Sequence, residues 1–270
     1  MSRSLVQKQF GAVAADYAAS AVHASGPSLA ALVAMVGPQP DWQVLDVATG
    51  AGHTALALAP LVKRVIASDI TDEMLAQTAK LAAARQLKNV ETAHAEAGDL
   101  AFPLASFDLV TCRLAAHHFP DPAAFVVAAW RVLKPGGTFA LVDNVAPNAA
   151  RMRGATPAEI RDADTLYNTY EELRDPSHAR ALGLEDWLGL LTDAAFVDIR
   201  HEQMDQDIAF KAWTERMRCD PETVERLEHL LDNDLLRAFL RPRHEAGELL
   251  FTLQEAIIVA RKPDRPDTHP

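Results

Sequence analysis

The sequence predicts an α/β fold with a mostly parallel β-sheet, and residues 42–69 carry most of that prediction. An apolar run at 44–47 leads into the glycine turn ATGAG at 48–52. A helical pattern of apolar residues follows, and a second apolar run ends at Asp69. Strand, glycine turn, helix and strand in this order form the βα unit of a nucleotide-type fold. The turn glycines let a ligand approach the backbone, and the helix start offers unpaired N–H groups to an anion.

Two ligand classes fit this turn. The dinucleotide fingerprint G-x-G-x-x-G, centred on Gly50, lacks two of its three glycines, because Ala48 and His53 stand at the flanking positions. Centred on Gly52, the fingerprint places Ala55 at the third position, which is an allowed variant. A nicotinamide-dependent dehydrogenase therefore stays an alternative.

Two carboxylates favour the other class. Asp46, beside the turn, suits a ligand that carries an ammonium and a sulfonium better than it suits a pyrophosphate, because opposite charges attract at short range. Asp69, at the end of the second strand, can accept hydrogen bonds from both hydroxyls of a ribose.

With these residues in place, the sequence resembles the class I S-adenosylmethionine-dependent methyltransferases, in the branch that includes the ubiquinone and menaquinone C-methyltransferases. Four blocks match in family order and spacing: DVATGAG, VIASDITDEML, AEAGDLAFPLASFDLVTCRLAAHHFPD and RVLKPGGTFALVD. The resemblance covers residues 10–143, about half of the chain, and departs at Ala48, where the family often has glycine. It implies a Rossmann-like seven-stranded sheet, mostly parallel with an antiparallel last strand, a helical N-terminal segment and a lid insertion.

We expect one methyltransferase domain over residues 1–270. Its predicted parts are N-terminal helices at 1–40, a cofactor-binding core at 41–143, a substrate lid at 144–182, C-terminal strands and helices at 183–262 and a disordered tail at 263–270. The charged lid sequence follows the fifth predicted strand, and strands at 196–201 and 249–261 enclose helices at 209–241. Such a tail matches the methyltransferase sheet, whereas a nicotinamide domain would not need it.

The resemblance also implies S-adenosylmethionine as the cofactor and a set of contacts to it. In the family, residues equivalent to Ile70 and Leu100 lie against the adenine, and Asp99 accepts a hydrogen bond from its amino group. Tyr17 either covers the methionine end or is an ordinary packing residue of an amphipathic helix, and Arg113 faces the cofactor or pairs with a neighbouring acid. The cofactor-binding residues predicted in this way are Tyr17, Asp46, Ala48, Thr49, Gly50, Gly52, Asp69, Ile70, Gly98, Asp99, Leu100 and Arg113.

Methyl transfer from a sulfonium is an in-line displacement, so most of the acceleration can come from positioning the acceptor. A base is needed only when the acceptor must lose a proton. The candidates are His117, His118 and His178, because histidine titrates near neutral pH. They can equally be capping or supporting groups, and Tyr167 and Tyr170 are weaker candidates. We expect no metal site, since the histidines lack the i, i+4 spacing of zinc ligands.

Composition restricts the partners. A net charge of −11 and a pI near 5.3 argue against a nucleic-acid substrate, whose phosphates need a basic face. Two cysteines without metal-type spacing, an N-terminus without a signal segment and no long apolar run indicate a cytoplasmic protein without a membrane span. We therefore expect methyl transfer to a small, apolar or aromatic molecule. A homodimer is compatible with the sequence, and a non-catalytic cofactor-binding partner protein is the remaining alternative.

Overall fold

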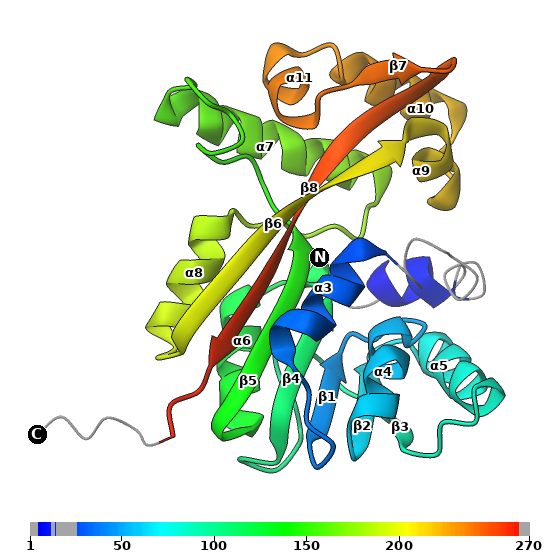
Figure 1. Cartoon of the computed structure of the whole chain (residues 1–270). Coiled ribbons are helices and arrows are strands. Elements are labelled where there is room, and N and C mark those ends of the chain that lie inside the picture. The colour runs from blue at the N-terminus through cyan, green and yellow to red at the C-terminus, as the bar shows by residue number, and fades with distance from the viewer. Residues whose placement is uncertain (1–4, 12–13, 15–25, 265–270) are drawn as a thin grey trace, which may run out of the picture.

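The computed structural model describes residues 5–11, 14 and 26–264, and a twisted β-sheet forms its centre (Figure 1). The sheet has the order β3-β2-β1-β4-β5-β8-β6, with β7 paired to β8. Neighbouring strands among the first five pair in parallel. These strands are β1 (Gln43–Val47), β2 (Arg64–Asp69), β3 (Val90–His94), β4 (Phe107–Arg113) and β5 (Leu133–Asn144). Their carboxyl ends meet at one edge, which is the edge where ligands bind in open α/β sheets.

The last strands confirm the predicted antiparallel end of the sheet. β8 (Glu248–Arg261) runs antiparallel to β5, and β6 (Val197–Ala209) runs antiparallel to β8. β6 is longer than the predicted strand at 196–201, and the three-residue β7 (Arg243–Glu245) was not predicted. The extension of β6 is mostly polar, EQMDQDIA over 202–209, because it forms a two-stranded ribbon with β8 beyond the sheet.

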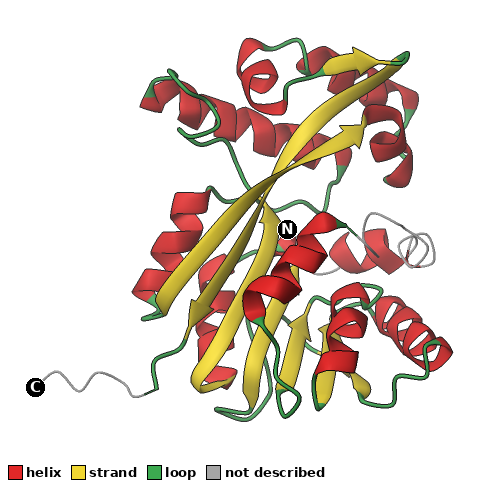
Figure 2. Cartoon of the chain, in the orientation of Figure 1, coloured by secondary structure: helices red, strands yellow, loops and turns green. Residues whose placement is uncertain are grey.

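Helices cover both faces of the sheet (Figure 2). On one face, Leu32 of α3 and Ala55 of α4 form a hydrophobic cluster with Val44 of β1. On the other face, Phe125 of α6 and Trp187 of α8 form a cluster with Leu45 of β1. Consecutive residues of β1 therefore point to opposite faces. The flanking helices are α3 (Pro27–Val36), α4 (His53–Leu58), α5 (Asp72–Ala84), α6 (Pro122–Val132) and α8 (Leu184–Asp193).

The β6/β8 ribbon carries a helical cap, drawn at the top of Figure 1. Its helices are α7 (Pro157–Arg174), α9 (Phe210–Arg216), α10 (Pro221–Leu230) and α11 (Asp234–Leu240). Side chains from 146–181 and 208–253 form one core here, so we call these two segments the cap. The segment predicted as a lid thus packs with the C-terminal helices around Tyr167, Trp213 and Phe239.

Local signals explain where the main cap helix begins. Thr156 accepts a hydrogen bond from the Glu159 N–H, and the Glu159 carboxylate accepts one from the Thr156 N–H, which forms a capping box before Pro157.

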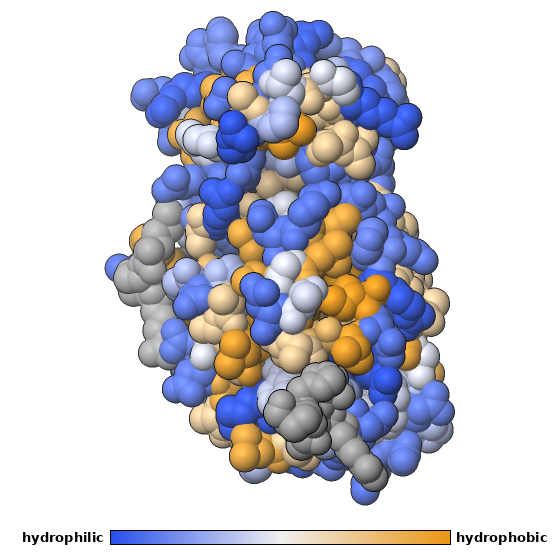
Figure 3. All heavy atoms as spheres, turned by 90° about the vertical axis from the view of Figure 1, so that its left-hand side faces the viewer, coloured by the Kyte–Doolittle hydropathy of each residue, from blue (hydrophilic) through white to orange (hydrophobic). Residues whose placement is uncertain are grey.

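Viewed from the side of α6 and α8, the apolar surface lies mainly beside the sheet, and the cap is mostly hydrophilic (Figure 3). Within the described residues, no helix is both long and apolar enough to cross a membrane.

Candidate active site

A cavity of about 390 Å³ lies at the carboxyl edge of the parallel strands. The loops after β1, β2, β3 and β4 line one side of it. Val6 and Phe10, from the helical residues 5–11, and Ser177 and Ala179, from the segment after α7, line the other parts. The fold therefore brings the N-terminal segment, the sheet and the cap to one place.

The turn after β1 has an unusual backbone. Ala48, Gly50 and Gly52 have φ angles of 51°, 54° and 87°, in the left-handed region that favours glycine. A Cβ at position 52 would lie 2.6 Å from the Thr78 Cγ2, so only glycine fits there. Nothing lies within 4 Å of the corresponding position at Gly50, which leaves space for a ligand against the backbone. Ala48 adopts the conformation for which the family's frequent glycine is suited.

Asp46 lies beneath this turn instead of in the cavity. Its Oδ2 accepts hydrogen bonds from the Thr49 hydroxyl at 2.6 Å and the Ala55 N–H at 3.2 Å, and its Oδ1 accepts one from the Thr111 hydroxyl at 2.7 Å. Burial raises its pKa to about 6, although the two threonine hydroxyls oppose the shift. The expectation that Asp46 stands beside the ligand therefore needs correction, because its hydrogen bonds turn the carboxylate toward the strand and the turn.

Asp69 lines the cavity at the end of β2. One oxygen accepts the Gly50 N–H at 2.9 Å, and the other accepts the Thr71 N–H at 2.9 Å. Burial raises its pKa, and these backbone hydrogen bonds oppose the increase. The carboxylate faces the cavity, where it can accept a ribose hydroxyl.

Only some of the residues predicted near the adenine line the cavity. Ile70, Gly98 and Asp99 line the cavity. Leu100 does not, because its side chain is fully buried in the core cluster below the sheet edge. Gly52 is likewise absent from the lining, since it packs against Thr78.

Arg113 lies at the end of β4, beside the cavity. It lines the cavity, and its Nε donates to the Thr54 hydroxyl at 3.1 Å. Burial lowers the pKa of the guanidinium, whereas Glu255 and Asp46 act in the opposite direction. It is therefore a buried cation at the carboxyl end of β4.

His118 is the candidate base that lines the cavity. Its ring lies edge-on to Phe10, with 5.0 Å between ring centroids. Its Nδ1 lies 3.0 Å from the Ser177 carbonyl oxygen, which can only accept, so Nδ1 carries the hydrogen. Its Nε2 carries none and lies 4.0 Å from the Asp175 Oδ2. Burial and the neighbouring His117 lower its pKa to about 4, which keeps the ring neutral at pH 7.

His117 lies directly behind His118, with 4.2 Å between the ring centroids. Its Nδ1 donates to the Asp143 Oδ1 at 2.6 Å, and its backbone N–H donates to the Asp143 Oδ2 at 2.8 Å. Burial alone would lower the pKa of His117, but the carboxylates of Asp143, Glu171 and Asp175 together outweigh it and the pKa is raised. In this adjacent pair, His117 is therefore the ring that holds a proton first.

His178 lies farther from the cavity. Its Nε2 is 2.9 Å from the Asn168 Oδ1, and burial strongly lowers its pKa. It does not line the cavity, and neither do Tyr167 and Tyr170, which are buried in the cap core. Tyr170 stacks on Trp213, with 5.2 Å between centroids. The expectation of a catalytic role for His178, Tyr167 or Tyr170 thus gives way to a structural one, because their polar groups are enclosed by the cap.

The sequence reasoning did not identify Asp143 and Ser177, which orient the two histidines. Asp143 could have been found, because it ends the fifth predicted strand at the ligand-binding edge. Ser177 could not, since its position depends on how the cap folds back. Tyr17 lies outside the described residues, and the described residues contain no group of three or more possible metal ligands.

Comparisons with known proteins agree with this geometry. A family model described as "Methyltransferase domain" matches residues 45–141. The uncharacterized methyltransferase YcgJ of Bacillus subtilis is 36% identical over 197 residues, which cover 72% of this chain and 73% of the relative. The crystal structure of YcgJ gives a TM-score of 0.80 at 30% identity and covers 88% of this chain and 99% of the other.

Two further relatives have more specific names. The nocamycin O-methyltransferase of Saccharothrix syringae is 30% identical over 213 residues, 75% of each chain. The demethylmenaquinone methyltransferase of Deinococcus radiodurans is 39% identical over 116 residues, 42% of this chain and 47% of the relative.

The residues present fit S-adenosylmethionine. The open space at Gly50 lets the cofactor lie against the backbone of the turn, and the cavity-facing carboxylate of Asp69 suits its ribose. The relatives and the family model exclude the nicotinamide-dehydrogenase alternative. The chain belongs to the class I S-adenosylmethionine-dependent methyltransferases.

Proposed function

We propose that the enzyme transfers a methyl group to a small, apolar or aromatic acceptor whose reacting group lies against His118. The observation that carries this proposal is the position of His118, a neutral ring in a cavity whose lining also includes the apolar side chains of Phe10, Leu114 and Phe119. Small-molecule sites are typically apolar with a few polar groups that fix orientation.

The cofactor supplies an activated methyl group, and the chain supplies position and proton handling. Asp69, Ile70 and Asp99 would hold the nucleoside, and the backbone of the turn at Gly50 would lie along the cofactor. His118 would accept a hydrogen bond from an acceptor hydroxyl at its Nε2. The His117–Asp143 pair, next to it, sets the charge around that ring, because a protonated His117 lowers the basicity of His118.

We further propose that the protein works in the cytoplasm. Cys112 is a free, buried thiol and Cys219 is a free, partly buried one. Unpaired thiols of this kind are usual in a reducing compartment. Fractionation of cells that express the tagged protein tests this location.

The acceptor class is tested in two steps. Calorimetric titration with S-adenosylmethionine, S-adenosylhomocysteine and NAD should give binding of the first two alone. Formation of S-adenosylhomocysteine is then measured with phenols, hydroquinones and peptides as acceptors. Turnover with phenols or hydroquinones supports the proposal, and turnover with peptides alone contradicts it. Cofactor binding without turnover on any acceptor would favour the non-catalytic alternative.

A further inference from the structure

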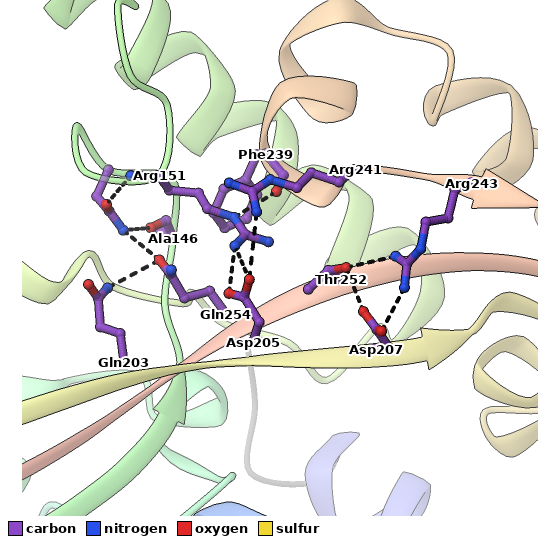
Figure 4. Close-up of polar contacts among 11 residues, drawn as sticks. Ala146, Arg151, Gln203, Asp205, Asp207, Phe239, Arg241, Arg243, Thr252 and Gln254 are labelled. Atoms are coloured by element: carbon purple, nitrogen blue, oxygen red, sulfur yellow. Dashed lines mark hydrogen bonds and ion pairs between the residues drawn. The ribbon is translucent and has the colours of Figure 1, made fainter.

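A second cavity, separate from the active site, lies between the cap and the β6/β8 ribbon (Figure 4). Its volume is about 700 Å³, within the range of small-molecule sites. The loop at 150–155 before α7, the residues Gln203 and Asp205 of β6, the end of α11 and Gln254 of β8 line it. Among the described residues, the two cavities share no lining side chain. We call this second cavity the ribbon groove.

Arg151 is the buried cation of the ribbon groove. Its side chain is only 3% exposed, its Nη1 donates to both oxygens of Asp205 at 2.5 and 2.6 Å, and its Nε donates to the Phe239 carbonyl at 3.1 Å. Its Nη2 is buried and has no hydrogen-bond partner among the described residues. Buried polar atoms of folded proteins nearly always have a partner, so this nitrogen indicates an acceptor supplied from outside the chain.

Arg243, on β7 beside the ribbon, has a hydrogen-bond partner at each of its side-chain nitrogens (Figure 4). Its Nε donates to Glu245 at 2.6 Å, its Nη1 to the Thr252 hydroxyl at 3.0 Å and its Nη2 to Asp207 at 2.6 Å. All three nitrogens are used although this side chain is 33% exposed and water could replace any partner. The more deeply buried Arg151 has the unfilled nitrogen, which is the opposite of what a purely structural role requires.

The charge of the ribbon groove favours an anion. Arg151, Arg153 and Arg241 line it, and Asp205 is the one carboxylate among its lining residues, so the formal charge is +2 in a chain of net charge −11. Arg241 is loosely held, since its Nη1 lies 3.6 Å from the Asp205 Oδ2 and its side chain is 54% exposed. Two arginines around one buried guanidinium suit a dianion with several oxygens better than a single carboxylate.

We propose that the ribbon groove binds a phosphate monoester, with the phosphate held by Arg151, Arg153 and Arg241. The volume beyond the phosphate leaves room for the organic part of the ester. Gln203 and Gln254, whose side chains are joined at 3.1 Å, supply further polar contacts in the groove. This site is distinct from the methyl-transfer cavity and adds a second ligand to the protein.

The experiment is a calorimetric titration of the full chain with inorganic phosphate, against sodium acetate at equal ionic strength. Saturable binding of phosphate without binding of acetate is expected. Arg151→Gln should weaken phosphate binding at least about tenfold, because charge-assisted hydrogen bonds are lost. Unchanged phosphate affinity in a folded Arg151→Gln protein would overturn the proposal, and so would the absence of phosphate binding to the unaltered chain.

Two further variants protect the test against misfolding. Arg241→Gln alters an exposed side chain and should also weaken phosphate binding about tenfold. Its matched control is Arg237→Gln, which removes one positive charge from α11, the helix that Arg241 follows, at the same 54% side-chain exposure but outside the groove lining. Equal losses in Arg241→Gln and Arg237→Gln would show general electrostatic attraction only and would overturn the site. Affinity for S-adenosylhomocysteine should stay unchanged in all three variants and reports the fold.

A final pair of measurements identifies the source of the phosphate. Glycerol 3-phosphate represents a free monoester, and vesicles of phosphatidylcholine with phosphatidic acid represent a lipid headgroup. Tighter binding of glycerol 3-phosphate than of inorganic phosphate supports a free metabolite. Sedimentation with the vesicles that is lost in Arg241→Gln but kept in Arg237→Gln supports a lipid. If both of these results are absent and calorimetry shows no binding of phosphate, the proposal is contradicted.

Discussion

The cofactor edge of the sheet and the cap are built in different ways. At the edge, the functional groups follow their own strands directly: Gly50 after β1, Asp69 at the end of β2 and Arg113 at the end of β4. In the cap, one core joins residues 146–181 to residues 208–253. The histidine cluster lies where the cap meets the sheet, because His117 is bonded to Asp143 of β5 and His118 to Ser177 of the cap. The edge is therefore assembled from local segments, and the cap from segments far apart in the chain.

This difference separates two tasks. We expect the edge to bind the cofactor without the cap, since its predicted contacts, such as Gly50 and Asp69, belong to the sheet and its loops. The cap closes the cavity and shapes the acceptor end, because Ser177 and Ala179 reach the cavity only through it. Changes in the cap should therefore affect stability and turnover, whereas changes at the edge should affect cofactor affinity.

The largest expected effect tests whether the cap is dispensable for cofactor binding. Phe239 is fully buried in the cap core, so Phe239→Ala should lower the free energy of unfolding by about 3–5 kcal/mol. Urea denaturation measures this loss, with Phe139→Ala in the sheet core as a control of equal size. The affinity for S-adenosylhomocysteine should not change in the folded cap variant. A strong loss of affinity there would show that the two regions are not separate.

Asp69→Ala should weaken S-adenosylhomocysteine at least about a hundredfold, because two charge-assisted hydrogen bonds to the ribose are worth roughly 1.5–3 kcal/mol each. Calorimetry measures the change. Asp99→Ala, which removes one exposed contact at the same cavity, should have a smaller effect. An Asp69→Ala protein that binds the ligand normally would refute the ribose assignment.

On the cap side of the comparison, His117→Gln and His118→Gln should each lower kcat about tenfold to a hundredfold for an acceptor that loses a proton, within the range of general-base catalysis or below it. Cofactor affinity should stay unchanged in both. His178→Gln is the control, because that ring is bonded to Asn168 and does not line the cavity. If neither His117 nor His118 matters for turnover, the cluster has no catalytic function.

The pH dependence of kcat sharpens the same point. Because Asp143 raises the pKa of His117 above its ordinary 6.5, the ring loses its proton only as the pH rises through that elevated pKa, and kcat should rise over the same interval. Asp143→Asn removes the carboxylate, lowers the pKa of His117 and should move the rise to lower pH. If the pH profile of kcat does not move in Asp143→Asn, the protonation of His117 does not control the rate-limiting proton transfer.

The smallest expected effect concerns the turn. Ala48 has φ of 51°, which costs an L-residue roughly 1–2 kcal/mol, and glycine loses roughly 0.5–1 kcal/mol through its greater flexibility. Ala48→Gly should therefore stabilise the protein by about 0.5–1 kcal/mol in thermal or urea unfolding. Ala51→Gly, at a neighbouring position without positive φ, should be destabilising instead.

Much of the cofactor edge could be predicted from the sequence. Strand, turn and carboxylate are consecutive in the chain at Asp46, Gly50 and Asp69, so their order alone placed them at one edge of the sheet. Three residues predicted to contact the cofactor do not line the cavity: Asp46 turns under the loop to meet Thr111, Gly52 packs against Thr78, and Leu100 turns into the core. Which way a side chain turns at a strand end depends on neighbours that the local sequence does not contain.

The sequence by itself determined the family, the cofactor and the parallel core, because these depend on short-range patterns of apolar runs and glycines. Only the tertiary structure decided which histidine reaches the cavity, which acid supports its neighbour and where Arg151 is left with an unfilled nitrogen. These are contacts across 26 residues for His117 and Asp143, 59 for His118 and Ser177, and 54 for Arg151 and Asp205. The His117–Asp143 contact follows from the pairing of β4 with β5, and the other two follow from how the cap packs on the sheet and the ribbon. No local propensity encodes this packing.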